Sequence, residues 1–377
     1  MGNRSRFEVV IIGAGIAGAS LAYFLSECGL SDILLLEREE QLARHSTGRS
    51  AASLVELDEK QTVQDLKLLG GRFLRNPPQG LCENAPLQRS GVLALLREPT
   101  APGSRRAIST LERAGVRFEL LSPQAAVGRV PELSPTCFEG ALFLPDNGRI
   151  DVHELLSSYL RYARRRGAEL RCGVEVEGIR SERGRCAAVV TRQGEIRASW
   201  VVNAAGAWAG RVGAMAGAAP IELRPLRRTI IVFAPPQGIS VSNWPFVVSD
   251  ADHLYFTPES GGVLLSPMDE DPSEPCEPYP DEAVIAAALE RLARLAPRLV
   301  PRSLTRKWAG LRTFAPDGVP VVGEDPLIKG FFWLAGQGGY GIESSPAVGR
   351  IAADLIAGGK TDHYDARLLA PARFGQA

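Results

Sequence analysis

The feature that most constrains the fold lies near the N-terminus, where an apolar run leads into a glycine-rich turn. Residues Val9–Ile12 are followed by Gly13-Ala14-Gly15-Ile16-Ala17-Gly18, and the next residues are small and apolar. This order predicts a buried parallel strand, a tight turn and a helix packed on the sheet. In such a turn Gly13 permits the sharp change of direction, Gly15 lets the backbone approach a phosphate, and Gly18 lets helix and strand pack closely.

A second apolar run, Ile33–Leu36, ends at Glu37, about 20 residues beyond the last glycine of the turn. An acid at the end of a second strand hydrogen-bonds a ribose hydroxyl, and the helix N-terminus attracts the pyrophosphate. Strands, turn, helix and acid together predict a bound dinucleotide. The alternatives are a tight strand–helix turn without a ligand and, less well supported, a membrane span, because the apolar stretch is short and interrupted by its own turn.

Length, charge and cysteine use narrow the class of protein. A chain of 377 residues suggests two domains, and its 43 basic and 43 acidic residues balance. This balance gives no electrostatic case for nucleic acid or an anionic membrane as the main partner. The six cysteines are scattered without a CxxC pair and the four histidines fit no zinc pattern. We therefore expect reduced thiols, no metal site, no cleavable signal, no integral membrane segment and a cytoplasmic protein.

Three later segments carry further signals. Residues 44–52 form a loop of hydroxyl-bearing and small residues with two arginines, which is either an ordinary polar connection or a second clamp on a pyrophosphate. Residues 220–301 hold short strands punctuated by prolines and predict a largely antiparallel sheet. Near the C-terminus, the strand Phe331–Ala335 runs into the glycine-rich Gly336–Ile342 and then a helix. A helix N-terminus there suits the electron-rich edge of a flavin.

Together, these motifs resemble those of the D-amino-acid-oxidase-like superfamily of FAD-dependent amine oxidoreductases. The matching segments, from about residue 8 to residue 345, are GAGIAG with Glu37, HSTGRSAA, VVNAAGAW, WAGLRTF with APDGVPVVG, and GQGGYGI. Within the superfamily, the chain is most similar to the bacterial D-arginine and D-amino-acid dehydrogenases, through NPPQGLCE, PLRR and NWPFVVS.

The resemblance implies an α/β fold. It combines an FAD-binding, Rossmann-like domain of the glutathione-reductase type with an interleaved substrate domain built on a largely antiparallel sheet. The FAD-binding domain is expected over residues 1–58, 146–218 and 306–377, and the substrate domain over residues 59–145 and 219–305. Many sarcosine oxidases attach their flavin to a cysteine in the segment that here reads Ala309-Gly310-Leu311-Arg312. Because that cysteine is absent, we expect non-covalent FAD.

The resemblance also implies which residues bind FAD. Ala17, Glu37 and Arg38 would hold the adenosine half, and the backbone of Val176 would meet the adenine. Beside the glycines of the first turn, the pyrophosphate and ring would be lined by Ser46, Thr47, Gly48, Arg49, Ser50, Ala51, Ala52 and Ser53. The isoalloxazine would lie along Gly338, Tyr340, Gly341 and Ile342.

For the substrate, Arg228, Tyr255 and Arg312 match positions that bind an amino acid carboxylate. The chemistry agrees, because guanidinium groups bind carboxylates in a bidentate manner and a phenol adds a donor. Without the motif, Arg228 would be read as a surface arginine. Gly339 would offer its carbonyl to the substrate amine. The implied reaction moves a hydride from the substrate Cα to flavin N5; imine hydrolysis then gives a 2-oxo acid and ammonia, with the electron acceptor and any catalytic base unidentified.

Three positions depart from the D-arginine dehydrogenases. Gly91 stands where that subgroup has an acidic residue, and Ser53 and Asp58 stand where it places a histidine and a tyrosine over the substrate. The carboxylate clamp is therefore kept while the side-chain pocket differs, which argues against D-arginine as the substrate. Three rival functions stay open at this point: a sarcosine- or glycine-type amine oxidase, a 2-hydroxy acid dehydrogenase, and a flavin-bearing subunit of a larger dehydrogenase.

Overall fold

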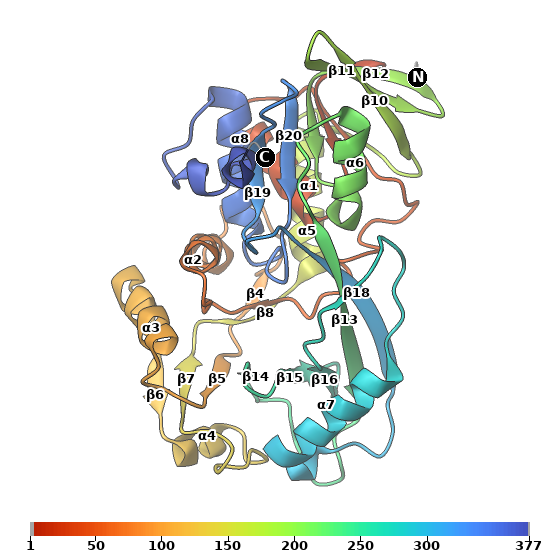
Figure 1. Cartoon of the computed structure of the whole chain (residues 1–377). Helices are drawn as coiled ribbons and strands as arrows, with labels where there is room; N and C mark the ends of the chain where they lie inside the picture. Colours follow the sequence, from red (N-terminus) through yellow and green to blue (C-terminus); the bar gives the residue numbers. More distant parts are fainter. Residues whose placement is uncertain (1–3, 376–377) are drawn as a thin grey trace.

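The computed structural model describes residues 4–375 and contains a mostly parallel sheet with helices on both faces (Figure 1). Its parallel strands lie in the order β9-β2-β1-β12-β20, and β10 and β11 continue from β12 as an antiparallel meander. The strands are β1 (Arg6–Ile12), β2 (Ile33–Leu36), β9 (Glu169–Arg171), β10 (Val176–Glu182), β11 (Arg185–Thr191), β12 (Gly194–Asn203), β19 (Val321–Glu324) and β20 (Phe331–Ala335).

Alternate residues of each strand point to opposite faces of this sheet, and each face is buried in its own core. In β1, Val9 and Ile11 pack in one core while Val10 and Ile12 pack in another. The helices of the first core are α1 (Ile16–Glu27), α2 (Gln61–Arg75), α5 (Val152–Arg165) and α8 (Ser345–Gly358). α6 (Ala209–Ala216) packs on the opposite face. Within residues 4–375, no helix combines the length and apolar character needed to cross a bilayer.

The second sheet is largely antiparallel, apart from the parallel pair β14 and β5. Its strands are β5 (Val92–Leu96), β6 (Glu119–Leu121), β7 (Gly140–Leu144), β13 (Arg224–Phe233), β14 (Phe246–Ser249), β15 (Leu254–Glu259), β16 (Gly262–Ser266), β17 (Asp271–Pro272) and β18 (Arg306–Phe314). α7 (Glu282–Leu295) covers one face, where Ile231 and Phe233 are buried, and Ile230 and Val232 face the other side. The remaining elements are α3 (Pro102–Ala114), α4 (Pro123–Arg129) and a small sheet of β3 (Ser53–Leu54), β4 (Leu87–Gln88) and β8 (Gly148–Ile150).

This architecture confirms the predicted fold class. Figure 1 shows β13 and β18 running side by side from the first sheet to the second, paired over nine residues of β18. By hydrogen bonding, β18 therefore belongs to the antiparallel sheet, although the predicted boundary placed residues from 306 onward in the other domain. α2 packs against α8, although its Leu68 also reaches the core on the second sheet. The domain boundaries themselves stay a prediction.

Candidate functional site

A cavity of about 350 Å³ lies at the carboxyl ends of the parallel strands. Ile12, Leu36 and Ala335 line it from the ends of β1, β2 and β20, and Ala204 lines it just after β12. This edge is where open α/β sheets bind ligands. The opposite wall comes from β13 and β18, so the cavity lies at the junction of the two sheets.

The first glycine turn forms one end of the cavity, and two of its glycines have no room for a side chain. Gly13 has a φ of 103°, and a Cβ added to it would lie 2.4 Å from the carbonyl oxygen of Ala204. A Cβ on Gly18 would lie 2.0 Å from the carbonyl oxygen of Gly13. Gly13 and Gly15 line the cavity, whereas Gly18 packs behind the turn. The backbone of β1, the turn and α1 therefore come as close together as the sequence pattern predicted.

The carboxylate of Glu37 is fixed at the cavity wall by backbone donors. The N–H groups of Ala14 and Glu39 donate to its two oxygens, each at 3.1 Å. The neighbouring Arg38 stacks on Trp208, with its Cζ 3.8 Å from the ring centroid. Glu37, Arg38 and Trp208 all line the cavity, together with Ala17 and Val176. The residues predicted for the adenosine half thus meet at one end.

Part of the loop over residues 44–53 also lines the cavity. The hydroxyl of Ser46 donates to the carbonyl of Leu311 at 2.6 Å, and the Oγ1 of Thr47 accepts the N–H of Ile16 at 3.1 Å. Arg49 donates to the carbonyl of Ala309 at 2.9 Å, and Ser50 accepts the N–H of Ala52 at 3.0 Å. These bonds hold the loop between the N-terminus of α1 and strand β18.

Four predicted residues of the same loop are not at the cavity wall. Gly48 is needed inside the loop, since a Cβ there would lie 2.0 Å from the carbonyl oxygen of Ala43. Ala52 is buried in the core around α1, Ala51 packs toward the second sheet, and Ser53 pairs with β8. Their roles in FAD binding stay predictions.

The glycine-rich segment after β20 lines the middle of the cavity with residues 336–339, Gly341 and Ile342. Tyr340 is turned away: its phenol donates to the carbonyl of Gly318, and burial raises its pKa. Gln337 was missed by the sequence analysis. Its amide nitrogen and oxygen are both buried, and neither has a hydrogen-bond partner within the part of the chain that the structure describes. An unpaired buried amide at a cavity wall can bind a ligand that offers both a donor and an acceptor.

Strand register brings the predicted substrate residues together. Arg228 lies opposite Gly310, and Arg312 lies opposite Leu226, in the antiparallel pair of β13 and β18. Arg228 and Arg312 are therefore diagonal neighbours on one face. Along the same face, Ile230 and Gly310 also line the cavity.

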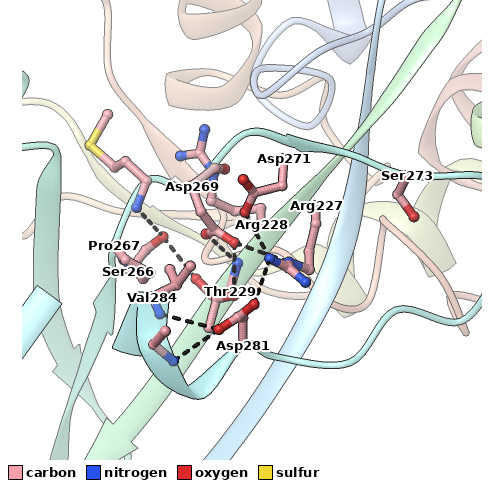
Figure 2. A network of polar contacts seen from close by, with 12 residues as sticks. Arg227, Arg228, Thr229, Ser266, Pro267, Asp269, Asp271, Ser273, Asp281 and Val284 are labelled. Atoms are coloured by element: carbon pink, nitrogen blue, oxygen red, sulfur yellow. Dashed lines mark hydrogen bonds and ion pairs between the residues drawn. The ribbon is translucent and has the colours of Figure 1, made fainter. Parts of the chain in front are cut away.

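Arg228 is buried and is held by its neighbours on one side only, and Figure 2 shows it beside Asp269. Its Nε donates to the carbonyl of Asp269 at 2.8 Å, and its Nη2 donates to the carboxylate of Glu270 at 2.7 Å. Its Nη1 is buried and has no partner among the described residues. Burial lowers the pKa of Arg228 to about 10, and the positive charge of Arg312 is the second cause of this shift. An anion beside Nη1 would accept the missing hydrogen bond and would offset the cost of burying this positive charge beside Arg312.

Arg312 lies between the glycine-rich segment and Tyr255. Its Nη2 donates to the Tyr255 hydroxyl at 3.4 Å, although Tyr255 itself does not line the cavity. A Cβ on Gly339 would lie 2.5 Å from the Nη1 of Arg312, so a side chain at this position would displace the guanidinium from where it lies. The structure thus brings Arg228, Tyr255, Arg312 and Gly339 into one group of neighbouring residues.

A buried ion pair lies behind the glycine-rich segment. Lys67 of α2 is 3.0 Å from the carboxylate of Asp58 and 3.5 Å from that of Glu343. Burial raises the pKa of Glu343 to about 7 despite Lys67, and Glu343 also accepts the N–H of Val55 at 2.7 Å. Burial lowers the pKa of Lys67, but Glu343 and Asp58 raise it overall. Asp58 therefore binds Lys67 rather than lining the cavity.

The lining of the cavity fits FAD. Glu37 can accept from ribose hydroxyls, the turn around Gly13 and Gly15 admits a pyrophosphate to the helix N-terminus, and the Gln337 amide can pair with a ring that carries donors and acceptors. Within residues 4–375, no group of histidine, cysteine and acidic side chains is arranged to hold a metal.

Comparison with known proteins gives the same family. The chain is 27% identical to the bovine FAD-dependent oxidoreductase domain-containing protein 1 (98% of this chain, 85% of that protein) and 27% identical to human mitochondrial sarcosine dehydrogenase (96% and 41%). It superposes on the crystal structure of L-proline dehydrogenase from P. horikoshii with a TM-score of 0.89 and 26% identity, covering 99% and 98% of the two chains. It spans about two-fifths of the length of several curated relatives that it matches.

A family model described as DAO, FAD dependent oxidoreductase, matches residues 8–355. That range includes both sheets and every predicted site residue. Because the match covers most of the chain, this protein belongs to the DAO family of FAD-dependent oxidoreductases.

Proposed function

We propose that this protein oxidises a D-amino acid at its Cα with non-covalently bound FAD, releasing a 2-oxo acid and ammonia after hydrolysis of the imine. The observation that carries the proposal is the diagonal pair Arg228 and Arg312 at the cavity wall, where the buried Nη1 of Arg228 has no hydrogen-bond partner within residues 4–375. A substrate carboxylate supplies the missing acceptor. The motifs around Arg228 and in residues 243–249, which resemble those of D-amino-acid dehydrogenases, favour the D-amino acid within this chemistry.

Each neighbouring residue has a defined task in this proposal. Arg228 and Arg312 bind the carboxylate, Tyr255 orients Arg312 through its hydroxyl, and the carbonyl of Gly339 accepts from the substrate amine. Holding both groups fixes the Cα, so these residues act mainly by positioning. FAD, when bound, accepts the hydride and so supplies the redox chemistry.

Non-covalent attachment is supported by where the cysteines lie. Of the six cysteines, all within the described range, none lines the cavity, and the wall at residues 309–312 has a glycine and no thiol. Acid precipitation should therefore release the flavin from the protein. Yellow colour in the washed pellet would contradict this part of the proposal.

A second candidate is oxidation of a secondary amine. It is favoured by the likeness to sarcosine dehydrogenase and to L-proline dehydrogenase, since the substrates in those names carry a carboxylate beside a secondary amine. The same arginine pair would hold that carboxylate, so the two candidates differ at the amine and the side chain.

The test is anaerobic reduction of the bound flavin. Purified protein is mixed with D-amino acids, L-amino acids, sarcosine, L-proline and 2-hydroxy acids, and loss of the visible flavin band is followed. Bleaching by D-amino acids supports the proposal. Bleaching by sarcosine or L-proline alone supports the second candidate, and a protein with bound FAD that none of these compounds reduces contradicts both. Hydrogen peroxide formation in air then shows whether oxygen is the electron acceptor.

A further inference from the structure

The carboxylate clamp already contains one carboxylate of the protein itself. The Oε1 of Glu270 lies 2.7 Å from the Nη2 of Arg228, on the segment that follows β16. The Arg228 side chain is 5% exposed, whereas the Glu270 side chain is 53% exposed. Glu270 therefore reaches from the surface to one side of a buried guanidinium, while the other terminal nitrogen of that group, Nη1, has no partner among residues 4–375.

The neighbouring acid, Asp269, is engaged elsewhere. Its oxygens accept the N–H of Thr229 at 2.6 Å and the hydroxyl of Thr229 at 2.8 Å, and Arg227 lies 3.6 Å away (Figure 2). Arg227 also pairs with Asp271 at 2.7 Å and Asp281 at 3.3 Å. The Asp269 side chain is thus held by Thr229 and Arg227, and the only hydrogen bond from Arg228 to Asp269 goes to its backbone carbonyl.

Among the described side chains in direct contact at the clamp, the charged groups are two guanidinium groups and one carboxylate. Arg228 and Arg312 contribute two positive charges, Glu270 contributes one negative charge, and Tyr255 contributes a neutral hydroxyl. A bound ligand with one carboxylate makes this set neutral. A ligand with a second carboxylate near the first leaves a negative charge without a partner, which is costly beside a buried group.

We propose that Glu270 is a specificity-determining residue that restricts the clamp to ligands with a single carboxylate. It does so by neutralising one of the two arginines, so that a dicarboxylate finds only one uncompensated positive charge. The inference rests on the proposed function, because it assumes that Arg228 and Arg312 bind the substrate carboxylate.

The test compares a matched pair of ligands in three variants. Dissociation constants of benzoate and isophthalate are measured from the change that they cause in the spectrum of the bound flavin. In Glu270→Gln, the ratio of the benzoate constant to the isophthalate constant should rise about tenfold, because the clamp then has two uncompensated charges. Glu270→Asp, which keeps the charge, should leave the ratio within about twofold of the wild type. Glu282→Gln removes an equal charge from an exposed pair with Lys307 and should leave the ratio of the two dissociation constants unchanged.

The outcomes separate this inference from the function on which it rests. If wild-type protein binds neither ligand, the clamp and the proposed function fail. If benzoate binds and the ratio in Glu270→Gln equals that of the wild type, the inference is overturned while the clamp stands. Equal weakening of both ligands overturns it too, since Glu270 would then only hold Arg228 in place. Equal FAD content and equal Tm in all variants exclude a folding defect as the cause.

Discussion

The two ends of the cavity are built in different ways. At the nucleotide end, the close contacts are made by backbone: Gly13 touches Ala204, Gly18 touches Gly13, and Glu37 is held by two backbone N–H groups. At the substrate end, the contacts are made by side chains: Arg228 of β13 pairs with Glu270 of the segment after β16, and Arg312 of β18 donates to Tyr255. The first end depends on short sequence spacings, and the second depends on the register of strands far apart in the chain.

This difference determines what a substitution should do. A side chain added at the nucleotide end meets backbone that cannot move away, so it should abolish cofactor binding. A side chain removed at the substrate end leaves the fold and the cofactor end intact, so it should spare FAD and damage substrate binding.

The largest effect is expected from Gly13→Val. Its Cβ would overlap the carbonyl oxygen of Ala204, and its φ of 103° is strained for a β-branched residue. We expect the variant to purify without bound FAD, which the ratio of flavin to protein absorbance measures. Gly29→Val is a matched control, because Gly29 also has a positive φ, of 89°, but open space around it. Loss of FAD in both variants would indicate a general folding defect instead.

Arg312→Ala should have the next largest effect, and at the other end. Removing one arginine of the pair leaves the substrate carboxylate with Arg228 alone, and losing a buried charged hydrogen bond costs about 2–5 kcal/mol. We expect kcat/KM to fall about a thousandfold with FAD content unchanged. Steady-state kinetics with the best substrate of the anaerobic panel measure this.

The control for that variant is Arg224→Ala, at the start of β13. Arg224 is exposed and lies outside the cavity, so its loss should leave kcat/KM within about twofold of the wild type. If Arg312→Ala kept its kcat/KM but lost FAD, the division between the two ends would be wrong.

The same contrast explains how far the sequence could predict the site. Gly13, Gly18 and Glu37 were found from spacing, because each acts within one strand–turn–helix unit and its neighbour strand. Arg228 was identified only through a motif resemblance, since nothing local distinguishes it from Arg227. The pairing of Arg228 with Gly310 joins strands that are neighbours in the sheet but are separated along the sequence by β14–β17 and α7, and no sequence period encodes it.

The residues that were missed show the same limit. Glu270 and Asp269 lie in a segment without a regular pattern, and their role depends on which arginine they face. Gln337 stands within a motif that was recognised for its glycines, and its amide is notable only because the fold buries it without a hydrogen-bond partner among the described residues. Asp58 was considered for the substrate pocket, whereas the structure pairs it with Lys67, because α2 packs against α8.

Glu343, behind the wall that joins the two ends, should give the protein a pH-dependent stability. Its pKa is about 7 in the folded protein against an ordinary 4.5. Between these values the folded state binds more protons than the unfolded state, so the free energy of unfolding falls as the pH rises through this window. Glu343→Gln removes the titrating group, so the decrease in the free energy of unfolding over this pH window should be smaller by on the order of 2 kcal/mol.

Urea unfolding of the wild type and the variant at pH 5 and at pH 7.5 measures this difference. Lys67 keeps its charge over the whole range, because its pKa is raised. The exposed substitution Glu282→Gln serves as the control and should leave the slope unchanged. Equal slopes in the wild type and Glu343→Gln would mean that Glu343 is ionised throughout, with Lys67 as its counter-ion.

The smallest effect is expected from Thr47→Val, and it tests how far backbone dominates the nucleotide end. The Oγ1 of Thr47 is a side-chain acceptor for the N–H of Ile16 at the start of α1, which resembles a helix cap. Its loss should lower the free energy of unfolding by about 1 kcal/mol and weaken FAD binding only severalfold, with Thr47→Ser close to the wild type. Urea unfolding and FAD titration of the apoprotein measure the two quantities. A loss of FAD as complete as in Gly13→Val would mean that side chains, and not the fixed backbone, determine cofactor binding, as they determine substrate binding at the other end.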